Sequence, residues 1–494
     1  MYADFFGMIC CFIRRTRGNL VTSIPALNRV SAGRWSSILF AGLCVVAFTA
    51  RLVGIDSYFD EDEVFSAQLA SGTLKRVLIE SLIDKPHPPL YNILLHFWLS
   101  IGGMSETYVR LLSVLLAVGA ISIYFCILRA RVRMVAAASA TLVMSLSGFL
   151  IYYGQEARPY ALISLIGAAN LLTFLRVLQA PRDRYKVLAW AASALALVYS
   201  QYFGAVYLLV EGIILLISMP AKTALRALAL AVLMSFSVLP WMWTAFHLKL
   251  DMSQIAWIHK PELRSLPDFF IGTVGWPPHT PGWLLLAALT ALFVLGFALC
   301  LRSGRLSLDV AVFASVALMP PCIAFVLSDM VDFSIWAPRQ LITSAFAFIV
   351  LIAIFVDSLP LAARRFAAAA LVIWAAAGAV DGFTTNRVAP YKDIFERIRR
   401  DSSNPIILAE ESWTLLPLRF YGRELNIQIF DLRSSKLTFQ IHSYYYVCRP
   451  NFCQYLAMLE RHFDRPTETM RFPFGTAGGE MRHEVFVYHF VSHG

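Results

Sequence analysis

Residues 36–66 have the sequence SSILFAGLCVVAFTARLVGIDSYFDEDEVFS. The stretch begins with a mostly apolar run, 36–55, of about the length that an α-helix needs to cross a bilayer. The four consecutive carboxylates of Asp60-Glu61-Asp62-Glu63 follow it. Neighbouring carboxylates repel one another unless a cation, a proton or a basic partner compensates them. The stretch therefore predicts a membrane protein. Its acidic cluster lies beside the membrane and is a candidate site for chemistry.

The composition agrees with a membrane protein. The chain has 494 residues, of which 58% are hydrophobic and 15% charged, and long apolar runs recur along most of it. Such a composition is typical of a polytopic helical membrane protein. The net charge of +10 does not indicate nucleic-acid binding, because the basic residues stand in short clusters between apolar runs. That is where the positive-inside rule places cytoplasmic Lys and Arg.

The apolar runs predict the membrane topology. We expect eleven spans, at 36–55, 110–129, 134–152, 159–179, 187–201, 203–219, 225–246, 283–301, 308–328, 339–357 and 366–381. With a cytoplasmic basic tail at 1–35, each cytoplasmic connection between spans is basic, as the positive-inside rule requires. We expect the first span to be an uncleaved signal anchor, because no cleavable signal peptide is evident before it.

The apolar segment 88–103 is not counted as a span. A crossing there would place the basic residues near Arg129 outside and invert every later basic loop. As a helix, the segment also carries Asn92, His96 and Ser100 on one face. We therefore expect an interfacial helix on the outer surface, within a first external loop at 56–108.

The last part of the chain has a different composition. Strands are predicted at 405–409, 441–447 and 484–491, and helices at 391–400 and 452–463. We expect a transmembrane domain at 36–381, followed by a small extracytoplasmic α/β domain at 382–494.

Two cysteines in that small domain are predicted to pair. Cys448 and Cys453 flank Pro450-Asn451, a turn-forming pair that can bring the two Cβ atoms together. Disulfides persist in extracytoplasmic compartments. The alternative is two free thiols in the core of the small domain.

Four short motifs fall on the predicted outer face. They are Tyr58-Phe59-Asp60-Glu61-Asp62-Glu63-Val64-Phe65-Ser66, Lys85-Pro86-His87-Pro88-Pro89-Leu90-Tyr91, Tyr152-Tyr153-Gly154-Gln155-Glu156-Ala157-Arg158-Pro159-Tyr160 and Trp336-Ala337-Pro338-Arg339. Carboxylates can act as a general base, whereas Lys, His and Arg recognise phosphate. Together they suit a transfer reaction with a lipid-linked phosphate as the leaving group. The same carboxylates suit hard cations, so Asp60 and Asp62 are candidate ligands for Mg²⁺ or Mn²⁺, although two carboxylates are too few to specify a metal.

These motifs resemble those of a known superfamily. The order Ser-x-x-x-x-Asp-Glu-x-x-Ser, His-Pro-Pro-Leu-Tyr and Tyr-Tyr-x-Gln-Glu-Ala-Arg-x-Tyr-Ala-Leu is similar to that of the bacterial GT-C membrane glycosyltransferases. Relatives in this superfamily include protein O-mannosyltransferases and lipid A aminoarabinose transferases. The resemblance covers roughly residues 36–360 and leaves out the C-terminal domain.

The resemblance implies an activity and a site. Such enzymes transfer a sugar, with inversion, from a polyprenyl-phosphate donor, and an acidic residue of the first external loop lies at the catalytic centre. Here that residue is Asp62, followed by Glu63, although the additional Asp60 leaves the choice of base open. The family often has His-Tyr where this chain has Gln201-Tyr202, so a role for that His is absent. The candidate donor-binding residues are Lys85, His87, Glu156, Arg158, Tyr160 and Arg339.

We therefore expect an integral protein of the bacterial inner membrane that transfers a sugar to an extracytoplasmic lipid or envelope glycan. A lipid or sugar transporter is one alternative, and it predicts ionisable residues near the middle of the spans. Glu211 is the main such residue, and the sequence shows no obvious partner for it. A noncatalytic envelope-assembly protein is the other alternative, and it would tolerate Asp62→Asn.

Overall fold

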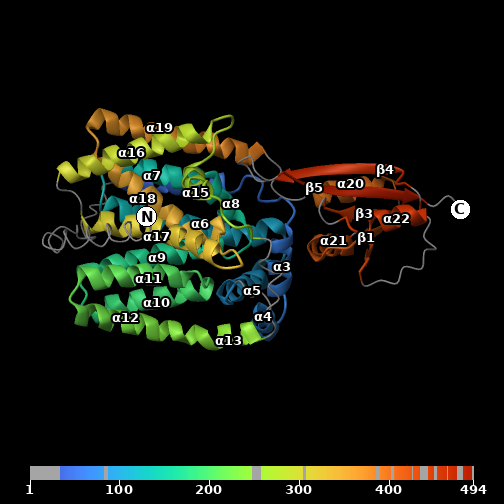
Figure 1. The fold of residues 1–494 in the computed structure, drawn as a ribbon, viewed down its shortest axis with the longest axis horizontal. Helices are drawn as coiled ribbons and strands as arrows, with labels where there is room; N and C mark the ends of the chain where they lie inside the picture. The colour runs from blue at the N-terminus through green and yellow to red at the C-terminus, as the bar shows by residue number, and fades with distance from the viewer. Residues whose placement is uncertain are drawn as a thin grey trace.

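The molecule has two parts, a large helical bundle and a smaller layer with a β-sheet at one end of it (Figure 1). The structure is a computed structural model. It describes residues 34–82, 87–247, 258–303, 307–384, 390–401, 405–424, 427–433, 443–449, 453–463, 465–475 and 482–491.

The helices of the bundle run mostly along the long axis of the molecule (Figure 1). They are α2 (Arg34–Ala50), α6 (Glu106–Arg129), α7 (Met134–Leu146), α8 (Gly148–Gln155), α9 (Tyr160–Gln179), α10 (Arg184–Ser200), α11 (Gly204–Ser218), α12 (Ala221–Ser235), η1 (Phe236–Val238), α13 (Leu239–His247), α15 (Ser265–Val274), α16 (Gly282–Arg302), α17 (Leu308–Met330), η2 (Pro338–Leu341), α18 (Ile342–Ser358) and α19 (Leu361–Thr384). In an 18-residue apolar window of the segment from η2 to α18, 89% of the residues are buried, so this segment belongs to the core of the bundle.

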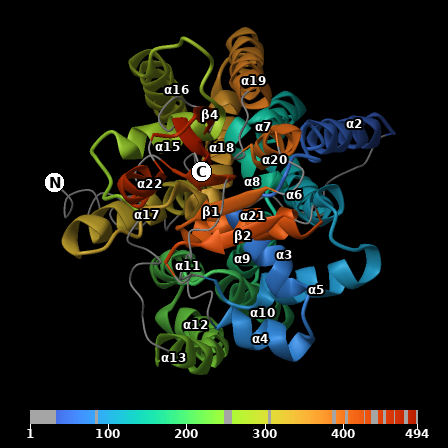
Figure 2. The ribbon, with the colours of Figure 1, turned by 90° about the vertical axis from the view of Figure 1, so that its right-hand side faces the viewer.

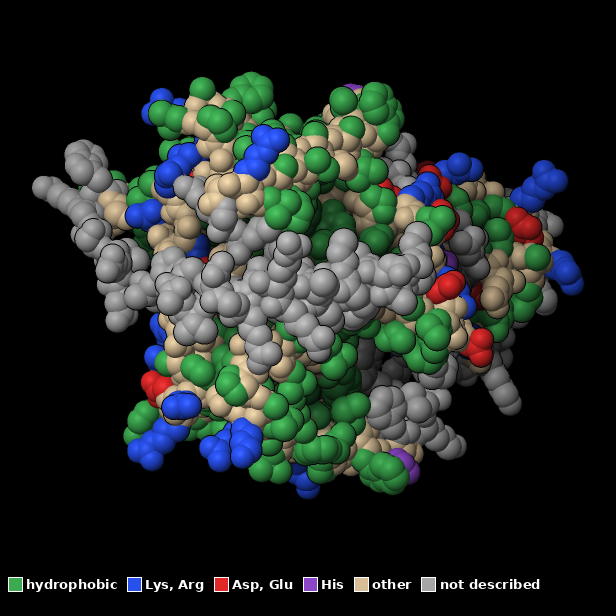
Figure 3. Space-filling model, turned by 60° about the vertical axis from the view of Figure 1, so that its left-hand side comes forward, with side chains coloured by type: hydrophobic (Ala, Val, Ile, Leu, Met, Phe, Trp, Pro, Cys, Tyr) green, Lys and Arg blue, Asp and Glu red, His purple; other side chains and the backbone are tan. Residues whose placement is uncertain are grey.

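The bundle confirms a polytopic helical membrane protein. Among the described residues, seven helices are long and apolar enough to cross a membrane, or eight if α7 and α8 form one bent span. A helix lies at each of the eleven predicted positions, but α2, α10 and α11 have only 17, 17 and 15 residues. Eleven crossings therefore remain a prediction. Hydrophobic side chains cover much of the visible bundle surface, and Lys and Arg gather toward the end away from the sheet (Figure 3).

The bend between α7 and α8 is held by a buried arginine. The two helices meet at a bend of 56°. The Arg51 guanidinium is fully buried and donates to the carbonyls of Met144, Ser145 and Leu150 over 3.2, 3.3 and 3.1 Å. The Gln155 side chain donates back to the Arg51 carbonyl over 2.9 Å. These bonds fix the end of α8, after which Glu156 and Arg158 follow.

Three shorter helices of the first external loop lie at the sheet end of the bundle (Figure 2). They are α3 (Glu61–Ala70), α4 (Leu74–Ser81) and α5 (Leu90–Gly102). The polar face of α5 meets the rest of the loop, because Asn92 donates to Ser81 Oγ over 2.9 Å and His96 Nδ1 lies 3.0 Å from the Ala70 carbonyl oxygen. On its other side Phe97 and Ile101 are exposed. The interfacial position of this helix remains a prediction.

The C-terminal layer is an α/β unit. Its helices are α20 (Tyr391–Asp401), α21 (Ser412–Glu424) and α22 (Leu456–Phe463), and its strands are β1 (Ile406–Ala409), β2 (Gln428–Asp431), β3 (Ser443–Cys448), β4 (Glu468–Gly475) and β5 (Arg482–Val491). The sheet order is β2-β1-β3-β5-β4, with β1 parallel to β2 and β3, and β5 antiparallel to β3 and β4. Ile407 in β1 is aligned with both Ile429 and Tyr445.

The sequence predicted part of this unit. The three predicted strands correspond to β1, β3 and β5, and the two predicted helices to α20 and α22. Strands β2 and β4 and helix α21 were not predicted. The Cys448–Cys453 disulfide is present, which confirms the predicted pairing. The expected boundaries at residues 35, 381 and 382 remain predictions.

Candidate functional site

The acidic run forms the N-terminal turn of α3. Asp60 is the N-cap: its Oδ1 accepts from the Glu63 amide over 2.8 Å, and the Glu63 side chain accepts from the Asp60 amide over 3.2 Å. This reciprocal pair is a capping box. A helix N-terminus also carries partial positive charge, so this position lowers the cost of gathering four carboxylates.

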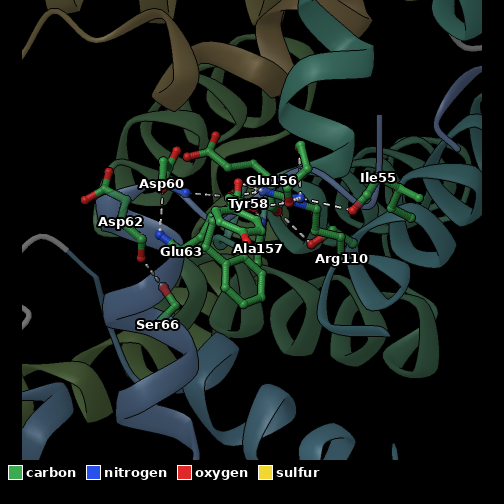
Figure 4. A network of polar contacts seen from close by, with 12 residues as sticks. Ile55, Tyr58, Asp60, Asp62, Glu63, Ser66, Arg110, Glu156 and Ala157 are labelled. Carbon is green, nitrogen blue, oxygen red and sulfur yellow. Dashed lines mark hydrogen bonds and ion pairs between the residues drawn. The ribbon is translucent and has the colours of Figure 1, made fainter. Parts of the chain in front are cut away.

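The carboxylates of this turn point in different directions. Successive residues in an α-helix are rotated by about 100° around its axis. Glu63 faces Arg110, whereas Asp62 points away from that arginine (Figure 4). Glu61 faces the C-terminal layer, where Tyr391 donates to it over 3.3 Å. Neighbouring acids in the sequence therefore have different surroundings.

Glu63 is part of a buried ion pair. Arg110 Nε donates to Glu63 Oε1 over 2.8 Å, and the Ala157 amide donates to the same oxygen over 2.9 Å. Arg110 also donates to the carbonyls of Ile55 and Tyr58 over 3.0 and 2.9 Å (Figure 4). The pair therefore joins α6, the start of the external loop and the turn before α9.

Arg110 was not among the predicted site residues. One signal was available in the sequence. An arginine at the outer end of a predicted span departs from the positive-inside rule, and such a charge needs a local reason. The reason is the acidic cluster, whose repulsion requires a basic partner.

Asp62 lies beside two predicted donor-binding residues. Arg339 Nη1 is 3.6 Å and Arg158 Nε is 4.0 Å from Asp62 Oδ2. Arg158 also donates to Ser66 Oγ over 3.1 Å, and Ser66 in turn donates to the Asp62 carbonyl over 3.0 Å. The Asp62 side chain is 30% exposed, so it remains accessible.

Three other predicted residues place buried polar groups in the same region. The Tyr160 ring makes an edge contact with His87 at 6.2 Å between ring centroids, and Arg339 lies over the Tyr160 ring at 5.7 Å. Within the described chain, His87 Nδ1, Glu156 Oε2 and Tyr160 Oη are buried without a hydrogen-bond partner. Buried polar atoms are usually satisfied, so these three atoms are candidates for hydrogen bonds to a polar ligand.

Burial changes the protonation of the groups around Asp62. Burial and the positive charges of Arg158 and Arg339 lower the pKa of His87 well below its usual value. Burial and the negative charge of Asp60 raise the pKa of Glu156 well above its usual value. Burial, Glu63 and Asp62 raise the pKa of Asp60 to about 7. Burial therefore favours the neutral forms of His87 and Glu156.

The roles of Lys85 and of a metal ion remain predictions. Lys85 lies outside the described residues. Among the residues that the structure does describe, no group of three or more His, Cys, Asp or Glu is arranged to hold a metal ion. Asp60 caps α3 and Asp62 faces two guanidinium groups, so these two side chains do not by themselves fit a metal-ligand set.

Comparison with known proteins identifies the fold. Residues 86–243 match the family model of dolichyl-phosphate-mannose-protein mannosyltransferases, which is less than half of the chain. Two structures of ArnT from Cupriavidus metallidurans, bound to undecaprenyl phosphate and in the apo state, superpose with TM-scores of 0.55 and 0.56. Each has 14% sequence identity and covers 92% of this chain and 98% of ArnT. The chain has the GT-C glycosyltransferase fold.

The GT-C fold agrees with the resemblance predicted from the motifs. Because the ArnT alignment covers 92% of the chain, it extends beyond residues 36–360, to which the motif resemblance was limited. The arabinofuranosyltransferase AftD from Mycobacteria aligns with a TM-score of 0.49 and 15% identity, over 93% of this chain and 40% of AftD. No curated protein matches the sequence.

Proposed function

We propose that this protein transfers a sugar from a polyprenyl-phosphate donor to a hydroxyl group of an extracytoplasmic lipid or envelope glycan, with inversion at the anomeric carbon. The supporting observation is that the Asp62 carboxylate lies next to two guanidinium groups, 3.6 and 4.0 Å away, beside buried polar atoms that lack partners. The GT-C fold and an ArnT structure bound to undecaprenyl phosphate support the same class of donor.

In this mechanism Asp62 is the general base. The acceptor hydroxyl transfers its proton to Asp62 while its oxygen attacks the anomeric carbon. The bond between that carbon and the phosphate oxygen breaks, and its electron pair leaves with the lipid phosphate. Arg158, Arg339 and Lys85 stabilise the charge on the departing phosphate, and the guanidinium groups can bind it in a bidentate manner.

The other carboxylates of the turn have different roles in the proposal. Asp60 caps the helix, and Glu63 is held by Arg110 and the Ala157 amide. A carboxylate that already accepts these bonds is poorly placed to take a proton from a substrate. His87, Glu156 and Tyr160 supply hydrogen bonds to the sugar or its phosphate. A divalent cation at Asp60 and Asp62 remains a prediction, and the mechanism has no step that depends on it.

The membrane placement completes the proposal. The N-terminus would be cytoplasmic, and the site and the C-terminal layer would lie outside the bacterial inner membrane. On the visible face of the bundle, basic residues lie mostly toward the end opposite the sheet, which supports this orientation (Figure 3).

A transporter is less well supported. Glu211, the mid-span carboxylate, has two partners, because Asn170 and Trp190 donate to its two oxygens over 2.7 and 2.8 Å. It therefore has a structural role within α9, α10 and α11 that needs no transported ion.

The purified protein in lipid nanodiscs tests the proposal. It is incubated with undecaprenyl-phosphate sugars of several kinds and an envelope lipid extract, and the release of undecaprenyl phosphate and the anomeric configuration of the product are measured. We expect release of the lipid phosphate together with an inverted glycoside. Lipid phosphate release without glycoside, or a retained configuration, would refute the proposed transfer, as would no release from any donor.

A further inference from the structure

The C-terminal layer contacts the turn that carries the proposed base. The Phe59 amide, one residue before the N-cap of α3, donates to Tyr421 Oη over 2.7 Å. The Tyr421 ring stacks on Tyr58 at 4.3 Å between centroids, and Phe420 makes an edge contact with Phe59 at 6.1 Å. Helix α21 thus holds the chain just before the acidic run.

A second contact reaches the acidic run itself. Tyr391 at the start of α20 donates to Glu61 Oε1 over 3.3 Å, and the Arg449 guanidinium contacts the same carboxylate. Arg449 follows Cys448, the last residue of β3, which is bonded to Cys453. The disulfide therefore braces the segment that presents Arg449 to α3.

Apolar packing joins the same surfaces. Val64 and Ala67 of α3 belong to one buried cluster with Tyr391 and Phe395 of α20 and Leu418 of α21. Helix α3 has only ten residues, and isolated helices of this length are marginal in water. Its orientation must therefore come from its neighbours. Arg110 holds one side of its first turn and the C-terminal layer holds the other.

We propose that the C-terminal layer positions the base: Tyr421 and the pair Tyr391 and Arg449 hold the first turn of α3 so that the Asp62 carboxylate faces Arg158 and Arg339. This inference rests on the proposed function, because it assigns Asp62 the role of base. Tyr421 is a positioning residue that acts through the backbone before Asp60 and needs no contact with substrate. Glu61 is an anchor, held by the layer on the side of the helix away from Arg110.

Two variants of the full-length protein test the proposal. Tyr421→Phe removes the acceptor of the Phe59 amide and keeps the aromatic ring. Glu61→Gln removes the charge that faces Arg449. Their matched controls are Tyr488→Phe in β5 and Glu468→Gln, since Glu468 pairs with Arg397 at 2.8 Å within the layer itself. The measurements are kcat, the donor KM, the thermal midpoint and hydrogen exchange of the amides at 59–66.

We expect kcat to fall roughly tenfold to a hundredfold in each test variant, because small misplacements of a catalytic group have effects of this size. The donor KM should stay as in the wild type and exchange at 59–66 should become faster. The thermal midpoint of Tyr421→Phe should fall slightly, because the buried Phe59 amide loses its acceptor. Both controls should behave as the wild type does. A rise in donor KM at unchanged kcat would overturn the positioning role, and so would unchanged kcat and exchange in both test variants.

The same experiment separates the two proposals. If the wild-type protein transfers no sugar, the proposed function fails, while faster exchange at 59–66 in Tyr421→Phe would still support the positioning of α3. If Tyr421→Phe does not fold, the kcat and amide exchange of Glu61→Gln test the positioning role instead. The Glu61 side chain is partly exposed, so it can lose its charge with little loss of packing.

Discussion

Arg110 and Glu63 form an ion pair at 2.5 Å with both side chains almost completely buried. Removing two charges from water is costly unless both are well bonded, and here each has further partners. Arg110 also donates to three carbonyls of the loop at 55–58. This pair compensates part of the repulsion among the four acids and fixes the loop that leads into the helical turn carrying Asp62.

The first prediction concerns the base. Asp62→Asn keeps the size of the side chain but cannot accept the acceptor proton, so sugar transfer should fall by roughly 10²–10⁴-fold while donor binding is retained. The measurement is the initial rate of transfer together with the affinity for undecaprenyl phosphate. Asp60→Asn is the matched comparison. A wild-type rate for Asp62→Asn with an inactive Asp60→Asn would assign the base to Asp60.

The second prediction concerns the donor phosphate. Arg158→Lys and Arg339→Lys keep the charge but lose the planar fork of donors, so the donor KM should rise in both. Lys85→Ala should raise it as well. Arg76→Lys in α4 is the control, because that arginine is exposed and pairs only with Glu80 among the described contacts. An unchanged donor KM in all three test variants would contradict the phosphate role.

The third prediction concerns stability. Arg110→Ala leaves a buried carboxylate without its cation and should lower the free energy of unfolding by about 3–5 kcal/mol. Arg76→Ala breaks a surface pair and should lower it by about 0–1 kcal/mol. Unfolding in detergent, followed by tryptophan fluorescence, measures both. Similar small losses would show that the Glu63 pair is not a buried anchor.

The fourth prediction concerns pH. The pKa of Asp60 is about 7 in the folded protein, raised from 3.8 chiefly by burial. The folded state therefore binds this proton more tightly than the unfolded chain does. Its contribution to stability is complete below pH 4 and is lost as the pH rises toward 7. Between pH 4 and 8, the thermal midpoint of the wild type should fall more than that of Asp60→Asn. Parallel curves of thermal midpoint against pH would contradict the raised pKa.

The fifth prediction concerns topology. If 88–103 lies on the outer surface, Ser105→Cys should react with an impermeant thiol reagent added to intact cells, in a background without other reactive thiols. Ser303→Cys, in a predicted cytoplasmic connection, should react only after permeabilisation. The reverse pattern would mean that α5 crosses the membrane.

Local features were predictable from the sequence. Hydrophobicity and length mark a membrane helix, because the bilayer requires a continuous apolar segment with internal backbone bonds, and a helix lies at each predicted span. The disulfide was predictable because Cys448 and Cys453 are separated by five positions across a turn. The four acids stood out in the sequence, but repulsion alone does not show which of them is free to react.

Only the tertiary structure decided the direction of each carboxylate. Glu63 meets Arg110, 47 positions away, and the amide before Asp60 meets Tyr421, 362 positions away. A rotation of α3 by one residue, about 100°, would exchange the surroundings of Asp62 and its neighbours. The composition of a ten-residue helix does not set that rotation; it is set by packing against residues that are distant in the chain and come together only when the bundle and the C-terminal layer close around α3.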